Sequence, residues 1–314
     1  MSLQIGHVGA GTYEPLQVVL VLALAVAYAL RARALAGRKA PVPVWRQVSF
    51  AAGVAIIVVS LISPIDHISD ELVLAHMAQH LLVGEIAAVL LVLGLTGPML
   101  QPVLAVRWLA WTRALAHPLV ALPIWVATLY IWHIPALYQE AVVSAPVHAA
   151  QHGSFIGAGF LMWMALLGPL PKPAWFGFGA KLGYIAAVRL AGAVLGNVFM
   201  WSGTVLYPDY AGGEAFWGIS PLTDQGTAGV IMMFESTVLT VATLAWLFLR
   251  WAKEDTERQR LVELAEARGI PLDPARAKRA VAAGEGARLE ERLMSDNGGE
   301  VGDRREIAGV SGDR

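Results

Sequence analysis

Cysteine is absent from this chain of 314 residues, and charged residues are scarce. Without cysteine there is no disulfide framework and no thiolate site, so a metal ion would need histidine, methionine or carboxylate ligands. Only 15% of the residues are charged, whereas 56% are hydrophobic. The mean hydropathy is +0.57. This balance is typical of an integral membrane protein and excludes an ordinary soluble domain.

The few charges are distributed unevenly along the chain. Roughly half of them follow residue 251, while the formal net charge is only −1. This balance gives no basis for a nucleic-acid partner. The first hydrophobic run begins near Leu16 without a basic segment before it, and Arg31, Arg33 and Arg38 follow it. We therefore expect this run to be a retained membrane span and not a cleaved signal peptide.

Seven hydrophobic windows are long enough to cross a bilayer, which requires about 20 residues of helix. They cover residues 15–33, 45–63, 72–96, 118–138, 147–168, 181–204 and 228–251. Clusters of proline, glycine and polar residues separate these windows, as expected for loops. The sequence therefore predicts an all-α membrane protein with seven transmembrane helices.

The positions of lysine and arginine predict the orientation, because the cytoplasmic loops of membrane proteins are enriched in both. The loops after the first, third and fifth windows carry basic residues, as does the tail after the seventh. The N-terminal segment and the loops after the second, fourth and sixth windows carry none. We therefore predict that the N-terminus lies outside and the C-terminus in the cytoplasm.

The chain is predicted to have three parts. An extracytoplasmic N-terminal segment covers residues 1–14, the transmembrane domain covers 15–251, and a charged cytoplasmic tail covers 252–314. In the tail, Gly269 is placed to end a helix that prolongs the last span, and Asp273 is placed to cap a second helix. Beyond Ser295 the composition predicts disorder.

Five histidines are predicted to lie at one depth near the outer surface. His76 and His80 open the third window, His148 and His152 open the fifth, and His133 lies near the outer end of the fourth. Residues spaced i and i+4 share one face of a helix, so each pair can present two imidazoles to one centre. These five histidines are therefore our predicted metal ligands.

Soft and acidic side chains are predicted to lie near the same surface. Thioether and imidazole suit Cu(I), whereas imidazole and carboxylate suit Cu(II) or zinc. The auxiliary candidates for metal binding or ion uptake are Asp66, His67, Asp70, Met77, Asp224, Met232, Met233 and Glu235. Each also has an ordinary explanation, since methionine fills gaps in a core and an aspartate such as Asp70 caps a helix.

Two further ionisable residues, Glu85 and Arg189, are predicted to lie inside the bilayer. Such groups are costly in a membrane and indicate function by default. We expect Arg189 to pair with an acid or with backbone carbonyls. Glu85 does not continue the face of His76 and His80, and both a structural role and a proton-relay role remain open for it.

Three segments carry a family resemblance in the same order along the chain. They are "SPIDHISDELVLAHMAQHLL", "WHIPALYQEAVVSAPVHAAQHGSF" and "SPLTDQGTAGVIMMFES". Together they resemble the CtaG family, which is associated with the assembly of caa3-type cytochrome c oxidase. The resemblance covers roughly residues 45–250 and leaves out the tail.

The resemblance implies a multi-pass protein of a bacterial cytoplasmic membrane that acts in forming an active haem-copper oxidase. The polar positions of the family correspond here to Asp66, His67, His76, His80, His133, His148, His152, Asp224 and Gln225. Their assignment to copper is our hypothesis. Copper would be delivered at the outer face to the catalytic subunit of the oxidase, with a soluble extracytoplasmic copper donor as a further candidate partner.

Three other functions can be compared with copper delivery. Histidines from different helices, such as His80 and His152, can be the axial ligands of a b-type haem, which would make the chain an electron-transfer protein. A retinal sensor needs a lysine within a span, and only Lys181 lies at the edge of one. A metal on three histidines can activate water with Glu235 or Asp224 as base, but no substrate-pocket signature accompanies it, so we expect no enzyme.

Overall fold

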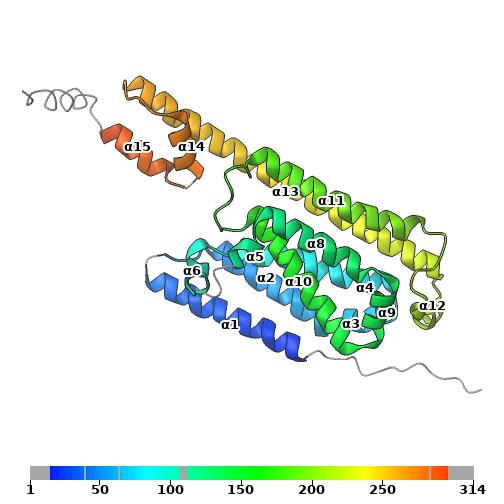
Figure 1. Ribbon diagram of the computed structural model, residues 1–314. Helices are drawn as coiled ribbons and strands as arrows, with labels where there is room; N and C mark the ends of the chain where they lie inside the picture. Colours follow the sequence, from blue (N-terminus) through cyan, green and yellow to red (C-terminus); the bar gives the residue numbers. More distant parts are fainter. Residues whose placement is uncertain (1–14, 39, 63, 107–111, 283, 296–314) are drawn as a thin grey trace, which may run out of the picture. The chain divides into compact units, whose positions relative to one another are not determined.

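The computed structural model describes residues 15–38, 40–62, 64–106, 112–282 and 284–295. The predicted N-terminal segment over 1–14 and the predicted disorder after Ser295 lie outside these residues. Within the described part, the secondary structure is helical and contains no strand, which confirms the all-α class. The chain forms two compact units, residues 1–240 and 241–314, and each is described by itself (Figure 1).

The first unit contains the helices that correspond to the predicted spans and several short connecting helices. They are α1 (Pro15–Gly37), α2 (Val44–Ile62), α3 (Pro64–Ser69), α4 (Val73–Leu81), the π-helical segment η1 (Leu82–Ala87), α5 (Ala88–Gly94), α6 (Gly97–Ala105), α7 (Thr112–Leu115), α8 (Pro118–Trp132), α9 (Pro135–Val143), α10 (Ala145–Leu167), α11 (Phe178–Trp201), the 3-10 turn η3 (Pro208–Tyr210), α12 (Ala211–Trp217) and the first part of α13 (Pro221–Ala267).

Among the described residues, five helical segments are long and apolar enough to cross a membrane. They are α1, α2, the continuous run of α4, η1 and α5, α11, and α13. The bent pair of α8 and α9 makes a sixth if it is counted as one span. The remaining predicted window corresponds to α10, a helix of 23 residues. The count of seven spans and the orientation of the termini stay predictions.

The fourth predicted window is broken instead of forming one straight helix. Helix α8 ends at Trp132, α9 begins at Pro135, and the two axes differ by 74°. Proline lacks an N–H and disfavours helical geometry in the residue before it. Ile134 accordingly has an extended backbone with ψ of 124°. The break leaves His133 at the end of α8, facing the interior of the bundle.

Glycines allow three helices to approach closely in the centre of the first unit. Helices α2 and α10 both pack against the run of η1 and α5 (Figure 1). A Cβ at Gly159 of α10 would lie only 1.8 Å from the carbonyl oxygen of Gly84 in η1. A Cβ at Gly53 of α2 would lie 2.9 Å from the carbonyl oxygen of Ala87. Small residues permit such backbone contact between membrane helices.

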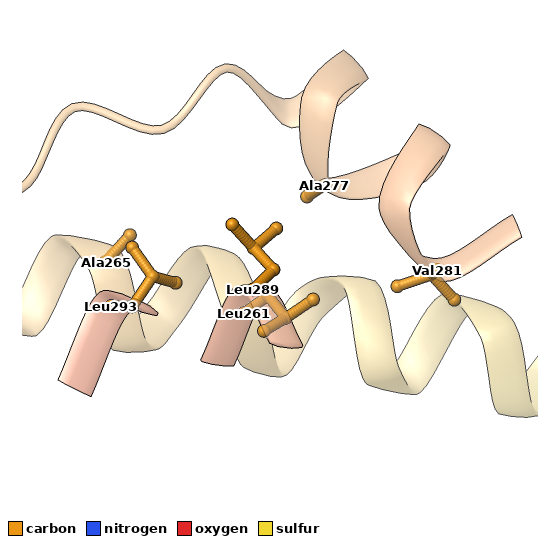
Figure 2. Packing of buried hydrophobic residues seen from close by; sticks show 6 residues of the cluster. All are labelled: Leu261, Ala265, Ala277, Val281, Leu289 and Leu293. Carbon is orange, nitrogen blue, oxygen red and sulfur yellow. The ribbon is translucent and has the colours of Figure 1, made fainter. Parts of the chain in front are cut away.

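The second unit has a hydrophobic core of its own, which the sequence did not indicate. It contains the end of α13 with α14 (Pro274–Ala282) and α15 (Gly286–Ser295). The core side chains, shown in Figure 2, are Leu261, Ala265, Ala277, Val281, Leu289 and Leu293. Gly269 has a φ of +67° just after α13, and Asp273 Oδ1 accepts a hydrogen bond of 2.9 Å from the N–H of Ala275. Both residues therefore have the helix-end roles that the sequence predicts.

Candidate metal site

Four histidines from two helices form one buried cluster. The ring centroids of His76 and His80 on α4 lie 4.3 Å apart, and those of His148 and His152 on α10 lie 4.2 Å apart. Between the helices, the rings of His76 and His148 are separated by 5.4 Å and those of His80 and His152 by 5.1 Å. The two pairs with i and i+4 spacing therefore face each other across the contact of α4 and α10.

The nitrogens of this cluster are poor in hydrogen-bond partners. Both ring nitrogens of His76, His80 and His152 are buried, and none of them has a hydrogen-bond partner among the described residues. The Gln151 side chain and the Ser69 backbone lie beside His76 without reaching hydrogen-bond geometry. A buried polar atom without a partner costs free energy, so such atoms call for an explanation. Neutral imidazole nitrogens are the commonest metal ligands in proteins, which makes a bound ion one such explanation.

The cluster is not arranged as a finished coordination site. Within the described ranges, no three His, Asp or Glu side chains are placed to hold one metal ion. An ion held by three of these imidazoles would therefore require ring rotation, whereas an ion held by two would not need a third convergent ligand. Such an incomplete arrangement suits transient binding better than a permanent structural site, which is normally closed.

Three tyrosines cover the cluster, and the sequence reasoning missed them. The ring of Tyr138 on α9 lies 4.9 Å from that of His76 and stacks at 3.9 Å on Tyr207. Tyr210 of η3 lies 6.3 Å from His76, and its hydroxyl donates to that of Tyr138 at 3.5 Å. At most 1% of each tyrosine is exposed. Their shared position follows from the chain fold, because no spacing in the sequence connects α9 with η3.

His133 lies beside this cluster and faces a methionine. Its Nδ1 donates to the carbonyl oxygen of Leu129 at 2.5 Å, and its Nε2 lies 3.5 Å from the sulfur of Met77. Its backbone carbonyl accepts a hydrogen bond of 3.0 Å from the hydroxyl of Tyr207. The fifth predicted ligand is therefore held firmly, at a position next to the four rings that contact one another.

The acidic residues that were predicted for ion uptake lie on α3 and just after it. Asp66 Oδ1 accepts a hydrogen bond of 2.9 Å from Gln79, whose amide also donates to the carbonyl of Ser60 at 2.7 Å. His67 lies 3.9 Å from Glu71 near the surface. Desolvation and then the charge of Asp66 raise the pKa of Asp70 to about 6. Asp66 thus fixes the residue next to His80, while His67 and Asp70 stay accessible.

Asp224 caps the helix that carries His76 and His80. Its Oδ2 accepts a hydrogen bond of 2.7 Å from the N–H of Val73, and its Oδ1 accepts one of 3.0 Å from the N–H of Leu74. Leu72, at the N-cap position, offers no side-chain acceptor. Both carboxylate oxygens are therefore engaged by the backbone. This geometry favours a structural role for Asp224, which the sequence had offered as an auxiliary ligand.

Replacing Asp224 with alanine is expected to destabilise the protein by about 1–3 kcal/mol, because the two N–H groups at the start of α4 lose their acceptor. Denaturant titration of the purified protein in detergent would measure the change. Asp209→Ala is the matched control, since Asp209 is an exposed aspartate of the segment between α11 and α13. Equal losses for the two variants would contradict the capping role.

A small cavity connects the histidines with the acids inside the bundle. Its volume is about 50 Å³, and its lining includes Met77, His80, His133, Met232, Glu85, Arg189 and Glu235. One carboxylate oxygen of Glu235 is buried and has no hydrogen-bond partner in the described part of the chain. Met233 points elsewhere, because its sulfur lies 3.2 Å from the place of a Cβ on Gly196 of α11. The structure thus brings Met77, Met232 and Glu235 to one cavity and leaves Met233 outside it.

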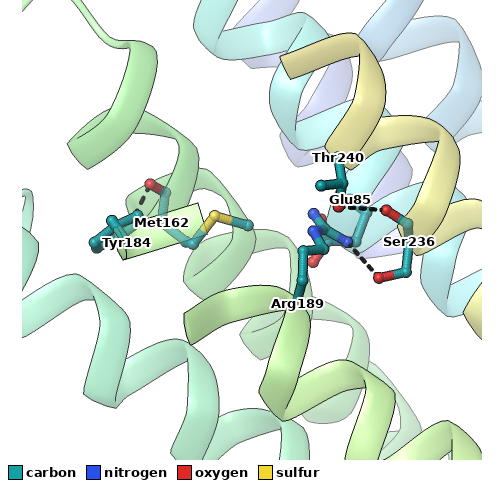
Figure 3. A network of polar contacts seen from close by, with 6 residues as sticks. All are labelled: Glu85, Met162, Tyr184, Arg189, Ser236 and Thr240. Atoms are coloured by element: carbon teal, nitrogen blue, oxygen red, sulfur yellow. Dashed lines mark hydrogen bonds and ion pairs between the residues drawn. The ribbon is translucent and has the colours of Figure 1, made fainter. Parts of the chain in front are cut away.

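Glu85 and Arg189, which both line this cavity, form an ion pair (Figure 3). Arg189 Nη2 lies 3.4 Å from Glu85 Oε2, and Nη1 donates to the hydroxyl of Ser236 at 3.1 Å. The hydroxyl of Thr240 donates to the carbonyl of Ser236 at 2.7 Å. The predicted pairing of Arg189 with an acid is therefore confirmed. The acid comes from η1, so the pair ties α11 to the helix that bears His76 and His80.

The fold and the site together define a class: a helical protein with membrane-spanning segments and a buried histidine cluster between two of its helices. The chain belongs to the cytochrome c oxidase caa3 assembly factor family, Caa3_CtaG, whose family model matches residues 26–254. The match confirms the resemblance carried by the three quoted segments. It contains the four clustered histidines, His133 and the whole cavity lining.

Curated relatives are more distant and longer than this chain. The chain is 28% identical over 232 residues to an uncharacterized protein of Mycobacterium bovis and to one of Mycobacterium tuberculosis. It is 25% identical over 232 residues to an uncharacterized protein of Mycobacterium leprae. Each match covers 68% of this chain and 35% of the relative, so the chain spans about a third of their length. No solved structure matches the chain.

Proposed function

We propose that the protein binds copper at the cluster of His76, His80, His148 and His152 and delivers it to a caa3-type cytochrome c oxidase in a bacterial cytoplasmic membrane. The observation that carries the proposal is the set of adjacent imidazoles whose buried nitrogens on His76, His80 and His152 have no hydrogen-bond partner. Membership in an assembly-factor family supplies the recipient, which would be the catalytic subunit of the oxidase.

The donor set favours copper over other metals. The chain has no cysteine, so zinc and iron–sulfur sites built on thiolates are excluded. Imidazole with thioether suits Cu(I), and both donor types lie within the same part of the bundle. A cargo ion must also leave, and a cluster that is not preorganised for three ligands holds an ion less firmly than a closed site. Copper would therefore be the cargo of the protein and not a resident cofactor.

The alternative of a b-type haem gains little support from the ring geometry. Axial histidines stand on opposite faces of a porphyrin, with the macrocycle between them. The rings of His80 and His152 lie 5.1 Å apart, centroid to centroid, and His80 also contacts Phe155 at 4.6 Å. These rings contact each other directly, so no macrocycle fits between them as they stand. The absence of a Soret band from the purified protein would agree with this preference.

The double variant His76→Ala, His80→Ala tests the copper proposal. The protein, purified in detergent, is loaded with Cu(I) under reducing conditions, and affinity is measured by competition with a Cu(I) chelator. We expect affinity to fall by more than about 100-fold, because even outer-shell residues of metal sites are worth about 10–100-fold. Undiminished stoichiometry and affinity would contradict the proposal.

The control for this experiment is His117→Ala. His117 caps the start of α8, at the opposite end of this helix from His133. Its ring centroid lies 6.0 Å from that of Trp175. The variant should leave Cu(I) affinity unchanged. In cells that lack the gene, the wild-type chain and the control variant should restore oxidase activity, whereas the double variant should not. Full restoration of oxidase activity by the double variant would show that the role in oxidase assembly does not depend on the cluster of four histidines.

A further inference from the structure

We infer a second ion position, formed by His133 and Met77 with Met232 at the shared cavity, next to the cluster of four histidines. The inference rests on the proposed function and deepens it, because the ion is the same cargo in its soft form, Cu(I). It assigns separate roles to side chains that the sequence placed in a single site.

The first argument concerns the protons of His133. Its Nδ1 lies 2.5 Å from the carbonyl oxygen of Leu129, and a carbonyl only accepts, so the ring proton must be on Nδ1. In the neutral ring, Nε2 then presents a lone pair. A thioether sulfur has no proton to give, and yet Met77 lies 3.5 Å from this nitrogen. Two electron-pair donors therefore face each other with no proton between them.

A hydrogen bond from the other ring nitrogen to a carbonyl is also the contact that fixes the ring of a metal-binding histidine. Such histidines almost always donate their other N–H to a carboxylate, a carbonyl or water, which sets the tautomer and the orientation of the ring. Leu129 provides this contact through its backbone. His133 is 8% exposed and Met77 is 1% exposed, so water does not compete freely for either donor atom.

The second argument is the distance between the two donor atoms. Bonds from a metal of this size are about 2.0 Å to imidazole nitrogen and about 2.3 Å to sulfur. Two such ligands of one tetrahedral ion stand about 3.5 Å apart. The separation of His133 Nε2 and Met77 Sδ is 3.5 Å. An ion bound to both atoms would therefore need no change in their separation.

The third argument is the cavity that both groups line. Met77, His133 and Met232 share it with His80, which also belongs to the cluster of four. A volume of about 50 Å³ is larger than one water molecule needs, so it can hold an ion with part of its shell. An ion can therefore pass from His80 to His133 without crossing packed side chains. Thioether ligands select Cu(I) at this second position.

X-ray absorption of the full chain loaded with Cu(I) tests this position. Because the chain has no cysteine, any sulfur neighbour of copper must be a methionine. We expect a copper–sulfur shell near about 2.3 Å in the wild type, next to nitrogen at about 2.0 Å. Met77→Leu should remove most of the sulfur shell and keep the nitrogen shell, since leucine conserves the side-chain volume.

Met233→Leu is the matched control, because its sulfur packs against α11 outside the cavity. It should leave the sulfur shell unchanged. Copper bound with nitrogen neighbours alone in the wild type would overturn the second position and leave the cluster of four standing. A sulfur shell that is undiminished in Met77→Leu would overturn it as well. Absence of any bound Cu(I) would overturn the proposed function and this inference together.

Discussion

Replacing Gly159 with alanine is expected to destabilise the protein by more than about 3 kcal/mol and to abolish Cu(I) binding. The added Cβ would lie 1.8 Å from the carbonyl oxygen and 2.9 Å from the carbonyl carbon of Gly84. Overpacking of a core by flexible side chains costs about 1–3 kcal/mol, and here the obstacle is backbone on both sides. Helix α10 must move away from η1, which separates His148 and His152 from His76 and His80.

Gly157→Ala gives a sharp contrast on the same helix. Gly157 is exposed, and a Cβ at this position would meet no atom within 4 Å. Alanine there should be neutral or stabilising by up to about 1 kcal/mol, because glycine is the poorer helix former. Thermal unfolding in detergent and Cu(I) competition would be measured for both variants. Similar behaviour of the two variants would contradict the close contact of α10 with η1.

Replacing Arg189 with methionine is expected to destabilise the protein by about 3–5 kcal/mol. Glu85 is 6% exposed, and its carboxylate lies 3.4 Å from the guanidinium of Arg189. Removing one partner of a buried pair leaves an uncompensated charge, which is far more costly than the pair itself. The double variant Arg189→Met, Glu85→Gln also removes the charge of Glu85. It should therefore recover a large part of the lost stability.

The control for the ion pair is Arg250→Met, which breaks an exposed contact of 2.7 Å with Glu254. Exposed pairs contribute about 0–1 kcal/mol, so this variant should differ little from wild type. Denaturant titrations of all four proteins in detergent would provide the comparison. A double variant no more stable than Arg189→Met alone would show that the arginine acts by packing, for example on Trp163 at 5.9 Å, and not by pairing with Glu85.

The histidine pairs were predictable because their geometry is local. The spacing of His76 and His80, and of His148 and His152, fixes a common face within each helix whatever the surroundings. The expectation that the two pairs lie close together followed from the prediction that both are near one surface. The sequence therefore predicted that both pairs and His133 would lie near one another, although not which rings would be in contact, the distances between them or the lack of convergence on one point.

Features that depend on long-range contacts were not predictable in the same way. The role of Asp224 depends on the start of a helix about 150 residues earlier in the chain. Tyr138 and Tyr210 reach His76 only through the bend at Ile134 and the folding of the loop before α13. Met77 and His133 are 56 residues apart, so their contact had no periodic signal. In each case the tertiary fold selects one of several ordinary roles for the residue.

The π-helical segment between Leu82 and Ala87 has a consequence for sequence length. A π-helical turn holds more residues than an α-helical turn, so it changes the angular phase of everything that follows. His76 and His80 lie before it, whereas Ala88, which packs near Gly159, lies after it. Deleting one residue here would rotate the second half of the span by about 100° relative to the first. The number of residues in this short segment therefore sets the rotation between the half of the helix that carries His76 and His80 and the half that packs near Gly159.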